Sequence, residues 1–105
     1  MGNRVNGLLG LATKAGKLIA GFDVVCENVE RGKVKLVIVS IEASEKTKNN
    51  IKFICDRHNV RCIEYGEIDI ISKAIGKENK AIIGIKDNNF ALSLINILDG
   101  VDAIG

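Results

Sequence analysis

The sequence of 105 residues contains no proline, no tryptophan, one tyrosine and one histidine. Because proline is absent, every break between helices and strands has to come from glycine, asparagine, aspartate or serine. The scarcity of aromatic rings disfavours any binding mode that stacks bases on an aromatic platform. No apolar run reaches the roughly 18–20 residues needed to cross a bilayer, and Leu8–Ala12 is too short for a signal-peptide core. We therefore expect a cytoplasmic protein without a membrane partner.

Cysteine is sparse and lacks a metal-binding pattern. Cys26, Cys55 and Cys62 are odd in number and no pair has the Cys-x-x-Cys spacing, so reduced and mostly buried thiols are expected. Cys55 and His58 share a predicted helix face and Cys62 follows on the next strand, but the fourth ligand of a structural zinc site is missing. A Cys–His nucleophile pair is an alternative in principle, although the sequence shows no oxyanion-binding device near it. We expect no metal.

The net charge is +2 at pH 7, and it is unevenly distributed. Acidic residues outnumber basic ones in residues 65–105, whereas residues 1–35 are weakly basic. A weakly basic segment permits contact with a polyanion without requiring it, and the alternative is a solvated charged face. The basic residues of the N-terminal third are Arg4, Lys14, Lys17, Arg31, Lys33 and Lys35.

The stretch from Gly21 to Glu42 organises the chain. Its first half predicts a short helix that Gly32 ends, since a residue just past the last turn often needs positive φ. Its second half, Val34–Ile41, is almost continuously apolar and β-branched. That composition is typical of a strand covered on both faces, as in a mostly parallel sheet between helices.

The remaining chain alternates helix and strand in the same way. Helical periodicity predicts a first helix that ends near Gly16, and Ser44 and Asp87 are good N-caps for later helices. We expect a single domain over residues 1–105, folded as a three-layer α/β/α sandwich with a mixed sheet of about four strands. The other predicted segments are strands Leu18–Ala20, Val60–Tyr65 and Ala81–Ile85, and helices from Ser44 to Asn59, from Glu67 to Ile75 and from Asp87 to Gly100.

A phosphate-binding loop is disfavoured at Gly10–Lys17. Such a loop needs four residues between its glycines and a Ser or Thr after its lysine. Here five residues separate Gly10 from Gly16 and Leu18 follows Lys17, on a predicted helix that follows no strand.

The central segment Arg31-Gly32-Lys33-Val34-Lys35-Leu36-Val37, after a glycine-led helix, resembles the kink-turn-binding ribosomal proteins. These are the archaeal large-subunit protein seven-Ae, the eukaryotic large-subunit protein thirty-e and their bacterial relatives. The resemblance spans nearly the whole chain and implies a non-enzymatic α/β/α protein, without cofactor or small-molecule substrate, that binds structured RNA. The segments closest to the bacterial branch are Leu8–Gly21, Glu42–Ser44, Gly76-Lys77-Glu78 and Phe90-Ala91.

The resemblance also implies a first RNA-binding segment. In the family, a Gly-x-Asn-Glu-x-x-Lys sequence at a helix start reads sheared G·A pairs. Gly21 keeps the glycine and Phe22 takes the variable position, but Asp23 replaces the asparagine, Val24 the glutamate and Glu27 the lysine. An ionised Asp accepts hydrogen bonds but cannot donate them, and a glutamate in place of lysine is expected to repel phosphate.

A second loop, which holds a flipped-out base in the family, corresponds to Gly76–Lys80. Gly76 and Glu78 match, whereas Asn79 and Lys80 replace an apolar and a small residue. The partner implied is ribosomal RNA or another kink-turn RNA, with the ribosome as a possible assembly. The alternative is a protein-interaction module that kept the fold but lost tight kink-turn binding. The further residues assigned to RNA are Lys14, Lys17 and Lys77, which would hold the backbone, and Glu42, an acid after the central strand.

Overall fold

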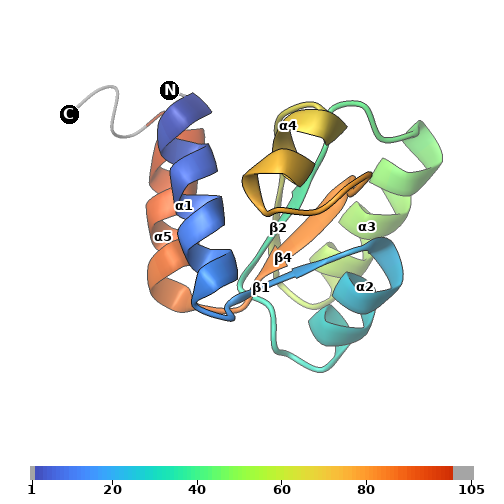
Figure 1. Ribbon diagram of the computed structural model, residues 1–105. Coiled ribbons are helices and arrows are strands. Elements are labelled where there is room, and N and C mark those ends of the chain that lie inside the picture. Colours follow the sequence, from blue (N-terminus) through green and yellow to red (C-terminus); the bar gives the residue numbers. More distant parts are fainter. Residues whose placement is uncertain (1, 101–105) are drawn as a thin grey trace.

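The computed structural model describes residues 2–100, apart from the side chains of residues 2 and 3. Helices and strands alternate in the expected order, and three of the four strands are shorter than expected (Figure 1). The central strand, for example, spans Leu36–Val39 and not Val34–Ile41. The elements are α1 (Gly2–Lys14), β1 (Leu18–Ala20), α2 (Phe22–Glu30), β2 (Leu36–Val39), α3 (Glu45–Arg57), β3 (Arg61–Glu64), α4 (Ile68–Ala74), β4 (Ile82–Ile85) and α5 (Asn88–Leu98).

The capping residues and glycines that the sequence indicates mark the helix ends in the structure. The Ser44 side chain accepts a hydrogen bond from the Thr47 N–H, and the Asp87 carboxylate accepts one from the Phe90 N–H at 2.9 Å, so both residues cap helices. Gly32 follows the C-cap residue of α2 and has φ of 73°, a conformation that glycine adopts at little cost.

The four strands form one sheet in the order β1-β4-β2-β3. Only β2 and β3 are parallel, and β4 pairs antiparallel with both β1 and β2. The mixed sheet is therefore confirmed, and the mostly parallel arrangement suggested by the apolar central strand is wrong. That strand is buried because helices cover both faces of the sheet, which does not require parallel neighbours.

Successive residues of β2 alternate between two cores. Leu36 and Ile38 pack with α1, α4 and α5 on one face, whereas Val37 and Val39 pack with α2 and α3 on the other. Figure 1 shows the sheet between these two groups of helices. The period of two along a strand produces this division, and it gives the expected three layers.

The sheet has two ends, which we name after one residue each. At the Gly21 end, β1 and β2 finish and β4 begins, and the Gly21 N–H donates to the Ile82 carbonyl at 2.9 Å. At the Lys86 end, β1 and β2 begin and β4 finishes, and the Lys86 N–H donates to the Lys17 carbonyl at 2.8 Å. Loops that are distant in sequence therefore meet at each end.

Candidate nucleic-acid interface

Gly21 forms the turn between β1 and α2. Its φ of 111° and ψ of 146° lie in a region that is essentially restricted to glycine. A Cβ built on Gly21 would meet no atom within 4 Å, so the space above the turn is open. The backbone conformation thus requires glycine, and the same residue leaves room for close approach by a ligand backbone.

The loop of residues 76–80 lies beside this turn, because β4 begins where β1 ends. Gly76 and Asn79 have positive φ, 71° and 55°. Ser72, which is 3% exposed, accepts a hydrogen bond from the Lys80 N–H at 2.8 Å and donates one to the Lys80 carbonyl at 3.3 Å. One buried hydroxyl therefore holds the end of the loop against α4. Sequence reasoning missed Ser72, because a serine inside a helix gives no signal of a distant partner.

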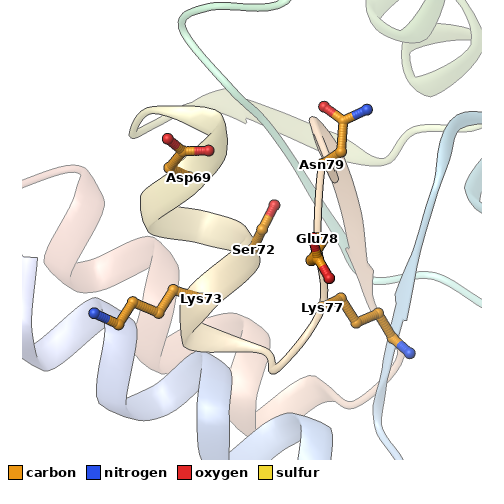
Figure 2. A pocket seen from close by; sticks show the side chains of 6 residues that line it. All are labelled: Asp69, Ser72, Lys73, Lys77, Glu78 and Asn79. Carbon is orange, nitrogen blue, oxygen red and sulfur yellow. The ribbon is translucent and has the colours of Figure 1, made fainter.

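Between α4 and this loop lies a hollow of about 380 Å³. Figure 2 shows Ser72 directed from the helix toward the loop, with Lys73 and Lys77 pointing away to opposite sides. The hollow is bounded by carboxylate, amide, hydroxyl and ammonium groups, so it offers both donors and acceptors. Its lining residues are Asp69, Ser72, Lys73, Lys77, Glu78 and Asn79.

The first turns of α2 present a mixed surface at the Gly21 end. Asp23 lies in the first turn, and Phe22 and Val24 are 37% and 46% exposed. Glu27 forms an ion pair with Arg31 at 2.9 Å, one turn further along. Because Arg31 offsets the charge of Glu27, the repulsion of phosphate expected from this glutamate is reduced.

Glu42 has a partner within the fold. Its Oε1 accepts a hydrogen bond from the Ile68 N–H at 2.9 Å, at the start of α4, where Glu67 provides no side-chain cap. The Ser40 hydroxyl accepts from the Glu42 N–H at 3.0 Å and donates to the Gly66 carbonyl at 2.8 Å. Glu42 therefore lies at the Gly21 end and stabilises a helix N-terminus there.

The structure separates the lysines assigned to this site. Lys77 and Lys80 belong to the loop at the Gly21 end, and Lys14 lines a small hollow together with Gly76. Lys17 lies at the Lys86 end, bonded through its carbonyl to Lys86. Since β1 and β4 are antiparallel, Lys17 and Lys80 lie at opposite ends of this strand pair, and one loop-sized site cannot use both.

Charge differs between the two ends of the sheet. The loops at the Gly21 end carry more acids than bases, whereas those at the Lys86 end are basic. A phosphate backbone approaching the molecule is therefore attracted to the Lys86 end. The charged residues of the loops at the Gly21 end are Glu42, Glu67 and Glu78, against Lys77 and Lys80; those of the loops at the Lys86 end are Lys17, Arg31, Lys33, Lys35 and Lys86, against Asp87.

The cysteines and His58 form no metal-binding group. Among residues 2–100, no set of three or more His, Cys, Asp or Glu side chains is arranged to hold a metal ion. Cys55 is buried and His58 is exposed at the end of α3. A hydrogen bond between the thiols of Cys55 and Cys62 raises the pKa of Cys55 and lowers that of Cys62.

Within residues 2–100, no helix is long and apolar enough to span a membrane.

Two relatives and two solved structures resemble the chain over most of its length. Two proteins named RNA-binding protein YlxQ are similar, one from Bacillus subtilis (strain 168), 32% identical over 88% of this chain and 92% of the relative. The other, from Enterococcus faecium, is 38% identical over 89% of each chain. A Bacillus halodurans C protein of unknown function has a TM-score of 0.88, with 34% identity over 90% of this chain and 96% of that protein.

A more distant structure, the Giardia lamblia 15.5kD RNA binding protein, has the same fold. Its TM-score is 0.79 at 16% identity, over 91% of this chain and 85% of that one. The model of the Ribosomal protein L7Ae/L30e/S12e/Gadd45 family matches residues 3–95. The chain therefore belongs to the Ribosomal protein L7Ae/L30e/S12e/Gadd45 family, as the resemblance of its central segment suggested.

Proposed function

We propose that this chain is a single-domain, non-enzymatic, cytoplasmic RNA-binding protein that recognises kink-turn-like RNA at the Gly21 end of its sheet. The observation that supports this most directly is the contact between the Gly21 turn and the start of β4. The hydrogen bond from Gly21 to Ile82 places the turn beside the loop of residues 76–80. The names of the YlxQ relatives support RNA as the ligand.

Each part of this surface has a distinct role in the proposal. The bare Gly21 turn lets an RNA backbone approach the first turn of α2. Asp23, as an acceptor, pairs with amino groups on base edges. Phe22 and Val24 offer apolar contact to bases, since both are partly exposed.

The hollow between α4 and the neighbouring loop would receive a base that is flipped out of the RNA stack. Unpaired and splayed bases are what proteins read most readily in RNA. The size of the hollow, about 380 Å³, is sufficient for one base. The ammonium groups of Lys77 and Lys80 would hold the adjoining phosphates, through contacts that weaken as salt rises.

The acidic character of the Gly21 end shapes this recognition. Phosphate contacts give affinity, and base contacts give specificity. The loops at this end carry three carboxylates against two lysines. The proposed site therefore recognises RNA shape and exposed base donors, and it attracts polyanions in general only weakly. We therefore expect a preference for kinked over regular RNA rather than a high affinity for RNA in general.

Fluorescence anisotropy tests this proposal. A kink-turn RNA and a fully paired duplex of the same length are titrated at several salt concentrations. We expect the kinked RNA to bind more tightly, and Lys77→Gln/Lys80→Gln to reduce the preference. The control Lys46→Gln/Lys52→Gln removes the same charge from α3 and should leave the preference unchanged. Equal affinity for the two RNAs would contradict the proposal.

One observation favours the second candidate, a protein-interaction module. Phe22, Val24, Ile41 and Ile70 all lie at the Gly21 end and are 37%, 46%, 51% and 42% exposed. Apolar side chains gathered among acids suit a protein partner better than a phosphate backbone. If neither RNA binds at low salt, this candidate replaces the RNA-binding function.

A further inference from the structure

A row of lysines crosses the Lys86 end of the sheet. Lys17 directly precedes β1, Lys86 directly follows β4, and Lys35 directly precedes β2. These three strands are neighbours in the order β1-β4-β2. The main chain connects the three positions, because Lys86 donates to the Lys17 carbonyl at 2.8 Å and Lys35 donates to the Ile85 carbonyl at 2.7 Å.

Adjacent strands lie about 4.8 Å apart, so the main chain holds the three lysines close together. Lys33 extends it along the loop that leads into β2. Lys17, Lys33, Lys35 and Lys86 are all exposed, and within residues 2–100 the ion pairs do not include them. Like charges held together in excess of their counter-charges repel one another, which an anionic ligand relieves.

Nearby charges do not neutralise the row. Arg61, at the start of β3, is paired with Asp99 at 2.6 Å. The adjacent acid, Asp87, accepts the Phe90 N–H at the start of α5 and is engaged as a cap. Asp87 keeps its negative charge as a cap, but one carboxylate offsets only part of the charge of four lysines.

We propose that the lysine row at the Lys86 end is a second RNA-binding surface, which contacts the phosphate backbone of an RNA segment outside the Gly21 site. The identity of the polyanion rests on the proposed function. Lysine ammonium groups on flexible stems bind phosphate as point charges and read no sequence. The row thus supplies the affinity that the acidic Gly21 end lacks, while the Gly21 end supplies the selectivity.

The two surfaces are too far apart for one loop of RNA to occupy both. Lys86 follows Lys80 by six residue steps along an extended chain, which corresponds to about 20 Å. An RNA that touches both must present two segments, such as a kinked element and a flanking helix. The alternative ligand, an acidic protein segment, is tested together with RNA.

The experiment compares two variants with the same net charge. Lys35→Gln/Lys86→Gln removes two charges from the row, and Lys46→Gln/Lys52→Gln removes two from α3. Affinity for the kink-turn RNA and for the paired duplex is measured against salt concentration. Each phosphate contact contributes about one to the slope of log affinity against log salt, so the row variant should lower the slope by about two. We expect this loss with both RNAs, with their affinity ratio unchanged.

The outcomes separate the two proposals. Equal slopes for the row variant and the α3 variant would overturn the second surface, whatever the wild type prefers. A wild type that binds both RNAs equally, with a lowered slope in the row variant, would overturn kink-turn recognition and leave the second surface standing. Absence of RNA binding at low salt would overturn both. Displacement of bound RNA by polyglutamate at equal charge concentration, with the row variant insensitive to it, would assign the row to acidic proteins instead.

Discussion

The hydroxyl of Ser72 accepts a hydrogen bond from the Lys80 N–H at 2.8 Å and thereby ties the loop before β4 to helix α4. Ser72→Ala leaves a partly buried N–H without its partner, and we expect unfolding to become easier by about 1–2 kcal/mol. Urea denaturation measures this, and amide exchange at Lys80 should accelerate. The control Ser93→Ala, on the exposed side of α5, should change stability by less than about 0.5 kcal/mol. Equal effects of the two substitutions would show that the hydroxyl does not hold the loop.

Glu42 allows a structural role to be distinguished from an RNA-binding one. Its carboxylate caps α4 through the Ile68 N–H. Glu42→Ala should therefore destabilise the protein by about 0.5–2 kcal/mol, even without RNA. Glu42→Gln keeps a carbonyl acceptor and should recover most of the loss in a urea titration. If Ala and Gln cost the same, the capping hydrogen bond contributes nothing and the charge alone matters.

The three thiols should differ in reactivity. Burial raises the pKa of Cys26, and the hydrogen bond to Cys62 raises that of Cys55. The same hydrogen bond lowers the pKa of Cys62, which is partly exposed. Because thiolate is the reactive form, iodoacetamide at pH 8 should modify Cys62 first in the folded protein. Mass spectrometry of digested samples reads this order, and faster labelling of Cys55 would contradict it.

The carboxylate of Glu64 should give the stability a pH dependence. Hydrogen bonds from Lys52 and Lys48 lower its pKa below the usual value of 4.5. A lowered pKa contributes stability that is complete above the unfolded-state value and is lost as the pH falls through the folded-state value. The wild type should therefore exceed Glu64→Gln in urea stability at pH 6 and lose this small advantage toward pH 3. Glu30→Gln, at an exposed site on α2, is the control, and an advantage that persists unchanged to pH 3 would contradict the linkage.

The elements were predictable because their signals are local. Alternating or helical apolar spacing and the caps Ser44 and Asp87 act over a few residues, and the structure confirms them. Strand order was not predictable, because pairing joins segments such as Leu18 and Ile85 that are far apart in the chain. The site depended on that order, and Lys17 consequently lies with Lys86, a residue that sequence reasoning had not considered.

The position of β4 also bears on how the fold can be built during synthesis. The last strand of the chain occupies an inner place in the sheet, between β1 and β2. When the N-terminal two thirds have left the translation machinery, β2 and β3 can pair, but β1 has no neighbour to join. Bringing such distant segments together carries an entropic cost. The edges of β1 and β2 also stay unpaired until residues 82–85 have been synthesised. The native sheet is therefore completed in a late step. Nascent chains that stall before β4 expose unpaired strand edges, which can pair with other chains.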